Sequence, residues 1–259
     1  MAVLLTAGCG SSQKSQPVDG KNRNVRPAAD QPKTYGFTVV AKYPHDPAAF
    51  TQGLQLYNGF LYEGTGLPGH SSIRKVELAT GKVLQKLDLS PRYFGEGVTV
   101  LNNKLYELTW TTKVGFIYDL ATFKPLGQFH YDWEGWGMTN DGKNLIITDG
   151  SNKIRFVDPS TFDVVRTIEV SRGGRPLDEL NELEYINGEI YSNIWHSDMI
   201  ARINPADGKL LGMIDLRGIA TGVPLGSEDV LNGIAYDPSS GCLLVTGKRW
   251  PWLYQIKLK

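Results

Sequence analysis

One pattern of about ten residues recurs five times in this chain, and it limits the fold more than any other feature does. Each copy reads as a small or polar residue, a short strand of alternating apolar residues, a turn and the start of a second strand. The copies begin at Gly53, Gly97, Gly137, Glu182 and Gly233, so successive starts lie 44, 40, 45 and 51 residues apart. A period of roughly 40 to 50 residues is typical of propeller blades.

Each repeat predicts a small antiparallel sheet of four strands. The fifth copy ends with the chain after its third strand, residues 252–258, and therefore lacks a fourth. An apolar strand predicted over residues 35–43 supplies it, which closes the ring and covers an open sheet edge. We therefore predict an all-β fold, a five-bladed β-propeller over residues 34–259 whose N-terminal strand pairs in the last blade. A β-sandwich is the alternative, but it does not explain the near-equal spacings.

Composition and charge restrict the classes of partner. At 259 residues and 41% hydrophobic content, the chain can bury one large core as a single domain. The 27 Lys and Arg residues balance the 27 Asp and Glu residues, so no basic footprint for nucleic acid is present. We expect a monomer that binds no nucleic acid. No stretch approaches the roughly 20 apolar residues that cross a bilayer as a helix.

The first residues resemble an export signal. The sequence MAVLLTAGC over residues 1–9 places an apolar run and small residues before Cys9, as in bacterial lipoprotein signals, and a polar tether follows. Residues 21–33 are polar and contain Pro27 and Pro32, as expected for a linker. We predict that residues 1–33 are a signal remnant and disordered linker, and that lipid on Cys9 makes this an exported, periplasmic or membrane-anchored lipoprotein of a bacterium. A disordered tail with a chance cysteine is the alternative.

Two aligned columns of the repeat hold unusual residues. In a propeller, equivalent positions of the blades converge around the central channel, so each column forms a ring in space. The first column, just before each aligned start, holds Gln52, Glu96, Trp136, Asn181 and Asn232. The second, near the end of the following strand, holds Gly66, Trp110, Gly150, Trp195 and Lys248. Because neighbouring strands are antiparallel, both rings are predicted to line the same mouth of the channel.

The two rings combine one carboxylate, three indoles, a primary amine and several carboxamides. Indole and amide N–H groups suit a polarised carbonyl oxygen, aromatic faces suit an ammonium, and a single carboxylate suits a proton shuttle. The other candidates receive structural interpretations. We expect Trp133, Trp250 and Trp252 to pack or lie on the rim, and we expect backbone amides or arginine to be the partners of Glu107, Glu134, Glu182 and Glu184. An assisting role in the site is the alternative for Glu182, which adjoins Asn181.

Metal-binding and disulfide signals are missing from the sequence pattern. The four histidines show no metal-ligand spacing, and Cys242 lies alone in an apolar strand. We predict no zinc site, no disulfide and no cofactor.

Eight short segments carry a family resemblance: FTQGL at 50–54, EGTG at 63–66, FGEG at 94–97, LTW at 108–110, EGWG at 134–137, LNELE at 180–184, NIW at 193–195 and TGK at 246–248. In this order they resemble the glutaminyl-peptide cyclotransferases of plants and bacteria, five-bladed propellers unrelated in fold to the zinc-dependent animal enzymes. The loop over residues 217–229 matches nothing.

The resemblance implies a reaction and a set of site residues. The reaction converts an N-terminal glutamine of a peptide or protein to pyroglutamate and releases ammonia, without a metal. Glu96 is then the acid/base residue, and Lys248 lowers the pKa of the attacking amine, pairs with a carboxylate or binds a substrate carbonyl. The pocket-lining residues implied are Phe50, Gln52, Phe94, Trp110, Trp136, Asn181 and Trp195.

Two other classes of function fit the fold. A non-catalytic binding module leaves the paired polar columns unexplained. A propeller hydrolase of the lactonase or strictosidine-synthase type normally needs a calcium site of carboxylates and amides in its channel, whereas this channel is predicted to present one carboxylate and three indoles.

Overall fold

The computed structural model describes residues 32–259. Cys9 and the predicted signal segment lie outside the described residues. Within residues 32–259, no helix has the length and apolar character that a membrane crossing requires.

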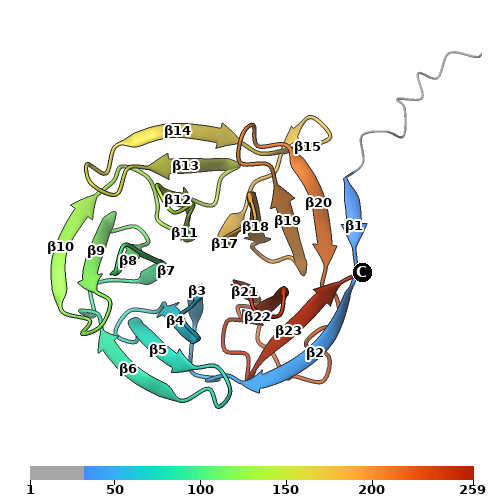
Figure 1. Ribbon diagram of the computed structural model, residues 1–259, viewed down its shortest axis with the longest axis horizontal. Helices are drawn as coiled ribbons and strands as arrows, with labels where there is room; N and C mark the ends of the chain where they lie inside the picture. The colour runs from blue at the N-terminus through green and yellow to red at the C-terminus, as the bar shows by residue number, and fades with distance from the viewer. Residues whose placement is uncertain (1–31) are drawn as a thin grey trace, which may run out of the picture. The chain divides into compact units, whose positions relative to one another are not determined.

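Five sheets, each built on four antiparallel strands, follow one another around a ring, and the sheet of blade 4 has an additional parallel strand (Figure 1). Blade 1 contains β3 (Thr51–Tyr57), β4 (Phe60–Thr65), β5 (Ser72–Glu77) and β6 (Val83–Asp88), and blade 2 contains β7 (Gly95–Leu101), β8 (Lys104–Thr109), β9 (Val114–Asp119) and β10 (Pro125–His130). Blade 3 contains β11 (Met138–Asn140), β12 (Leu145–Thr148), β13 (Lys153–Val157) and β14 (Val164–Glu169). A hairpin of β15 (Ser171–Arg172) and β16 (Arg175–Pro176) leads to blade 4, with β17 (Leu180–Ile186), β18 (Glu189–Ile194), β19 (Met199–Ile203) and β20 (Leu210–Asp215). Blade 5 contains β21 (Leu231–Asp237), β22 (Cys242–Gly247) and β23 (Trp252–Leu258), which confirms the predicted five-bladed propeller.

The N-terminal strand closes the ring as predicted. β2 (Phe37–Pro44) pairs antiparallel with β23, with Phe37 opposite Leu258 and Pro44 opposite Trp252. The first and last segments of the propeller therefore share one sheet, and this pairing covers the outer edge of blade 5.

The prediction of one continuous strand over residues 35–43 was wrong. The strand is interrupted at Gly36. The residues before it form β1 (Lys33–Tyr35), which pairs parallel with β20 as a fifth strand of blade 4. The predicted linker ended at Lys33, which is the first residue of β1. Gly212 of β20 allows this addition, because a Cβ there would lie 2.7 Å from Cε2 of Tyr35.

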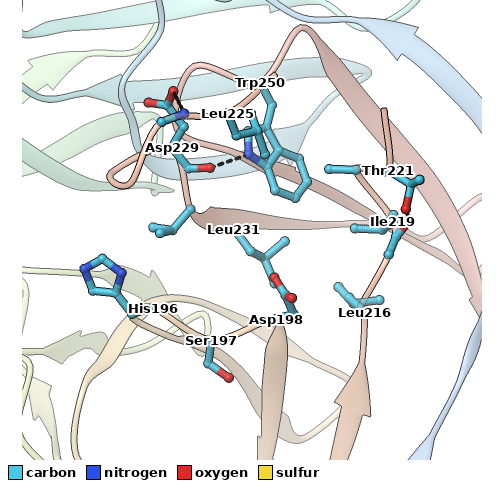
Figure 2. A pocket seen from close by; sticks show the side chains of 14 residues that line it. His196, Ser197, Asp198, Leu216, Ile219, Thr221, Leu225, Asp229, Leu231 and Trp250 are labelled. Atoms are coloured by element: carbon cyan, nitrogen blue, oxygen red, sulfur yellow. Dashed lines mark hydrogen bonds between the residues drawn. The ribbon is translucent and has the colours of Figure 1, made fainter. Parts of the chain in front are cut away.

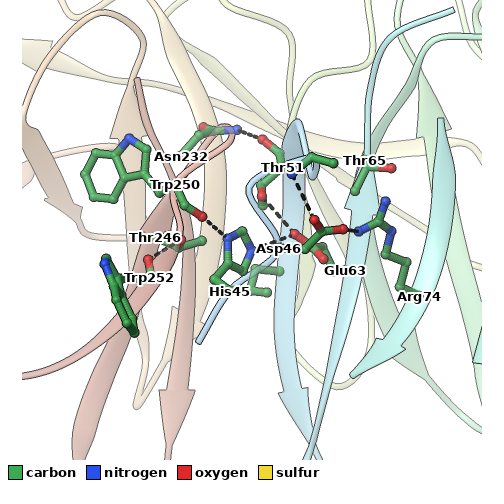
Figure 3. A network of polar contacts seen from close by, with 12 residues as sticks. His45, Asp46, Thr51, Glu63, Thr65, Arg74, Asn232, Thr246, Trp250 and Trp252 are labelled. Carbon is green, nitrogen blue, oxygen red and sulfur yellow. Dashed lines mark hydrogen bonds and ion pairs between the residues drawn. The ribbon is translucent and has the colours of Figure 1, made fainter. Parts of the chain in front are cut away.

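A buried polar network joins blade 5 to blade 1 beside the closure (Figure 3). Nδ1 of His45 lies 2.6 Å from the carbonyl oxygen of Trp250, and Nε2 lies 3.0 Å from Oε1 of Glu63. Both partners are acceptors, so both ring nitrogens donate and the imidazole is charged. Although burial opposes the charge, the Glu63 carboxylate raises the pKa of His45 above its ordinary value. Thr51 Oγ1 also donates to Glu63, at 2.8 Å.

Glycines allow the inner strands of neighbouring blades to meet at the channel. A Cβ on Gly53 would lie 2.4 Å from the backbone nitrogen of Val98, and a Cβ on Gly97 would lie 2.3 Å from that of Met138. Side chains are excluded from these contacts, so each inner strand is positioned directly by the backbone of the next. The apolar core lies between adjacent sheets.

Candidate active site

The first column of the repeat lies at irregularities in the inner strands. In four blades the pairing of the inner strand shifts register at this column, where Gln52, Glu96, Asn181 and Asn232 lie. A β-bulge bends its strand and re-aims the side chain of the extra residue. In the third blade, Trp136 precedes the first residue of β11. The repeat therefore directs five polar or aromatic side chains away from regular strand geometry at the same mouth of the channel.

Four of these side chains, Gln52, Glu96, Trp136 and Asn181, line a cavity of about 280 Å³. All nine predicted catalytic and pocket residues line it, so the structure brings the whole predicted set together, while their roles stay predictions. The lining residues are Phe50, Gln52, Leu67, Phe94, Glu96, Trp110, Trp136, Asn181, Trp195, Glu228 and Lys248.

Sequence reasoning missed two of the lining residues. Leu67 follows Gly66 of the second column and has a left-handed φ of 85°. Glu228 comes from the loop over residues 217–229, which has no counterpart in the repeat. The pocket therefore contains a second carboxylate, and the expectation of a single one was wrong.

Glycines of the second column make room for aromatic rings of the pocket. A Cβ on Gly66 would lie 2.3 Å from Cε1 of Phe94, and a Cβ on Gly150 would lie 2.6 Å from Cζ2 of Trp136. Phe94 in turn meets Trp110 edge to face, with ring centroids 5.6 Å apart. The alternation of glycine and tryptophan along the column therefore builds a nearly continuous aromatic wall.

Glu96 is a buried carboxyl group with little hydrogen bonding. Its side chain accepts one hydrogen bond within residues 32–259, from Nε2 of Gln52 at 3.4 Å, which is a long contact. Nδ2 of Asn232 donates to Oε1 of Gln52 at 3.2 Å, which turns the amide nitrogen of Gln52 toward Glu96. Burial raises the pKa of Glu96 well above its ordinary value, Glu134 raises it further, and Lys248 opposes the shift.

Lys248 is almost fully buried, with 4% of its surface exposed. Its Nζ lies 4.8 Å from the centroid of the Phe50 ring, within the range of a cation–π contact. Burial lowers the pKa of Lys248, while Glu96 and Glu228 counteract that effect. A buried amine and a buried acid therefore share the pocket, and each shifts the pKa of the other.

Glu134 binds two of the three indoles, contrary to prediction. Its Oε2 accepts Nε1–H of Trp110 at 2.7 Å and Nε1–H of Trp136 at 3.1 Å. The expectation that Glu134 pairs with backbone amides or arginine was therefore wrong. The two indole N–H groups are also engaged, so they are not the free donors that the sequence suggested. Trp136 lies two residues after Glu134, whereas Trp110 comes from the preceding blade, 24 residues earlier.

A buried acceptor in the pocket has no partner. Oδ1 of Asn181 is buried and makes no hydrogen bond to any residue between 32 and 259. An orphaned acceptor in a cavity favours a ligand that carries N–H groups.

The remaining glutamates have structural partners. Glu182 occupies the channel position that glycine fills in other repeats, and it accepts the backbone N–H groups of Leu54 at 3.2 Å and Ile234 at 2.7 Å, as predicted. Glu184 and Glu107 accept hydroxyl groups instead, from Thr139 and Tyr118. For these two residues the expected backbone or arginine partner was wrong.

The other tryptophans lie outside the pocket. Trp133 stacks on Tyr131 with ring centroids 5.6 Å apart, and Trp250 is buried and donates to the backbone oxygen of Asp229. Cys242 is free and buried in β22. In the described part of the chain, no three His, Cys, Asp or Glu side chains gather closely enough to hold a metal ion.

Fold and pocket together define a five-bladed propeller protein with an enzyme-type site, in which a buried acid and a buried amine face aromatic rings. A sequence model of the glutamine cyclotransferase family matches residues 3–258. The chain belongs to this family. A glutaminyl-peptide cyclotransferase of Arabidopsis thaliana is 51% identical over 229 residues, which span 85% of this chain and 71% of that protein.

Solved structures agree with this assignment. The glutaminyl cyclase of Myxococcus xanthus superposes with a TM-score of 0.83 at 34% identity, over 88% of this chain and 99% of that one. The WD40 propeller domain of Doa1 reaches a TM-score of 0.50 at 17% identity, over 79% of this chain and 62% of that one, and shares the fold alone.

Proposed function

We propose that this protein converts the N-terminal glutamine of peptides and proteins to pyroglutamate and releases ammonia. The observation that carries the proposal is Glu96, a carboxyl with a strongly raised pKa in an aromatic pocket of about 280 Å³. Membership of the glutamine cyclotransferase family and the activity for which the Arabidopsis relative is named support the same reaction.

The reaction is intramolecular, so positioning supplies much of the rate. The α-amine attacks the δ-carbonyl carbon of the same residue, a carbon–nitrogen bond forms, and the bond to the side-chain nitrogen breaks. Holding the folded rotamer in attack geometry gives a large gain in effective concentration. The rings of Phe94, Trp136 and Trp195 shape a pocket small enough to restrict a single glutamine side chain.

Glu96 moves the proton that the reaction must transfer. An N-terminal amine has a pKa of about 7.7 to 8.0 and binds as an ammonium at neutral pH. Because burial raises the pKa of Glu96 well above its ordinary value, transfer of a proton from the ammonium to Glu96 costs less than transfer to an ordinary carboxylate. The transfer produces the free amine and the acid together. Glu96 then protonates the departing nitrogen, which leaves as ammonia, and the regenerated carboxylate takes the second proton that the new ring nitrogen must lose.

The developing oxyanion needs donors that the protein does not already use. The indole N–H groups of Trp110 and Trp136 already donate to Glu134. The oxyanion is therefore stabilised by hydrogen bonds from Nε1–H of Trp195, the Asn181 amide and Lys248. Oδ1 of Asn181 accepts a hydrogen from the substrate amine. Lys248 favours the neutral amine through its positive charge.

The proposed reaction is tested with a peptide that begins with glutamine and with its asparagine, glutamate and N-acetylglutamine counterparts, followed by mass spectrometry. Loss of the mass of one ammonia from the glutamine peptide alone supports the proposal. A binding module leaves all four peptides intact. A lactonase-type hydrolase is identified instead by lactone cleavage that stops when calcium is chelated.

We also propose that the protein acts outside the cytoplasm of a bacterium as a monomer tethered by lipid on Cys9. The residues before Cys9 support this location. Labelling of full-length protein in cells with a palmitate analogue, compared with the Cys9→Ser variant, tests the tether. Equal labelling of the two proteins would contradict it.

A further inference from the structure

A second cavity of about 340 Å³ lies beneath the loop over residues 217–229, which joins blade 4 to blade 5. Figure 2 shows Leu216, Ile219, Leu231 and Trp250 at its floor. Leu216, Leu231 and Trp250 are buried, so the partly buried Ile219 contributes most of the apolar surface of the floor that a ligand can reach. Leu225 also lines this cavity, which we call the loop pocket, and is 36% exposed. A large partly exposed leucine over an apolar floor favours a ligand that brings an apolar side chain.

The loop pocket shares its wall with the candidate active site. Trp195 lines the active-site cavity, and the next residue, His196, lines the loop pocket. Likewise, Glu228 lines the active-site cavity and the next residue, Asp229, lines the loop pocket. The rings of Trp195 and His196 are in contact, with centroids 4.3 Å apart. At two places, therefore, consecutive residues of the chain line the two cavities, and the wall between the cavities is as thin as one residue.

The shared wall is firmly built on its loop side. Asp229 accepts hydrogen bonds from the backbone nitrogen of Gly226 at 2.8 Å, from Arg249 at 3.1 Å and, through its backbone oxygen, from Trp250 at 2.7 Å. In contrast, the backbone hydrogen bonds of residues 219–225 stay within residues 216–225 in the described chain. The wall is thus held in place, while the segment that carries Leu225 can adapt to a ligand.

A peptide substrate must pass over this wall or another part of the rim. If the proposed function holds, the active-site cavity encloses the first residue, and the peptide leaves through its mouth. Each further extended residue advances about 3.3 to 3.6 Å, so the second or third residue can cross a wall one residue thick. We propose that the loop pocket receives an apolar side chain from the second or third residue of the substrate. The exposed carboxylates of Glu228 and Asp198 lie at the edges of the loop pocket and would repel an acidic side chain of the substrate.

The test compares glutaminamide, which has no second residue, with Gln-Gly-Gly, Gln-Leu-Leu and Gln-Asp-Asp amides. We expect kcat/KM for the leucine peptide to exceed that for the glycine peptide about 10-fold, and the aspartate peptide to be the poorest. Equal kcat/KM values for the three peptides, or a preference for aspartate, would overturn the inference. If none of the four substrates releases ammonia, the proposed function fails and the inference fails with it.

Leu225→Ser tests the pocket itself. We expect this variant to reduce the advantage of the leucine peptide to about threefold or less and to leave glutaminamide turnover unchanged. Leu126→Ser is the matched control, because Leu126 is 56% exposed on β10 of blade 2. It should leave the whole peptide series unchanged. Ile219→Asp places a charge on the pocket floor and should abolish the leucine preference. Retention of the preference in both loop variants would refute the assignment.

Discussion

Substitution of His45 by leucine should destabilise the ring closure strongly. His45 and Glu63 are buried, with side-chain exposures of 6% and 3%, and they form the ion pair that connects blade 5 to blade 1. In His45→Leu, the Glu63 carboxylate stays buried and keeps only the Thr51 hydroxyl as a hydrogen-bond donor from this network. Removing one partner of a buried pair costs about 3 to 5 kcal/mol. For a domain of this size, that corresponds to a fall in Tm of about 6 to 20 °C.

The pair also predicts how stability depends on pH. The pKa of His45 is raised above its ordinary 6.5, so its contribution is complete below pH 6.5 and is lost as the pH rises through the raised value. The pKa of Glu63 is lowered from its ordinary 4.5, so its contribution is complete above pH 4.5 and is lost as the pH falls through the lowered value. The pair therefore stabilises the fold fully between pH 4.5 and pH 6.5. His45→Leu should remove the loss of stability on the alkaline side, which comes from the titration of His45.

Urea unfolding followed by tryptophan fluorescence measures the free energy of unfolding directly. Lys86→Gln is the control, because its ion pair with Asp88 is exposed, with 43% and 68% of the two side chains accessible, and should contribute about 0 to 1 kcal/mol. Adding Glu63→Met to His45→Leu removes the orphaned charge and should recover at least half of the loss. A loss in the free energy of unfolding below about 1 kcal/mol for His45→Leu would refute the reasoning. So would a double variant whose loss exceeds the sum of the losses of the two single variants.

Three further variants test the pocket. Glu134→Gln removes a negative charge that raises the pKa of Glu96, so the acidic limb of the kcat/KM profile should move to lower pH; an unmoved limb would contradict this. Lys248→Met removes an opposing positive charge, and the same limb should move to higher pH, as a pH titration of initial rates would show. Gly150→Ala should lower kcat/KM about 10-fold or more with the fold retained by circular dichroism, because the added Cβ would lie 2.6 Å from Trp136 and Gly150 has a φ of 79°; wild-type activity would show that Trp136 can move freely.

The repeat made the fold and most of the pocket predictable. A position within a propeller repeat corresponds to a radial position around the channel, so the aligned columns alone are enough to place Glu96, Trp110 and Lys248 together. The bulges that aim Gln52 and Asn181 leave no separate sequence signal, but the alignment included them because each of these blades bulges at the same position.

The remaining features depend on paths that do not repeat. Glu228 lies in a loop without a counterpart in other blades, so no column contained it. The bonds from Trp110 and Trp136 to Glu134 depend on how two loops meet in space, which spacing along the chain does not encode. The break at Gly36 was missed because residues 35–43 alternate well as one strand, and only Gly212 on a distant strand indicates that β1 can pack there.

In the proposed reaction, Glu96 carries the proton between the attacking amine and the departing ammonia. The most direct measurement is the single-turnover rate of Glu96→Gln with a glutamine-initiated peptide, beside Glu77→Gln, in which a glutamate of β5 outside the pocket is changed. Glu96→Gln should cyclise the peptide about 10²- to 10⁴-fold more slowly with similar substrate affinity, and Glu77→Gln should match the wild type. A rate for Glu96→Gln within a few-fold of the wild type would show that Glu96 does not carry this proton.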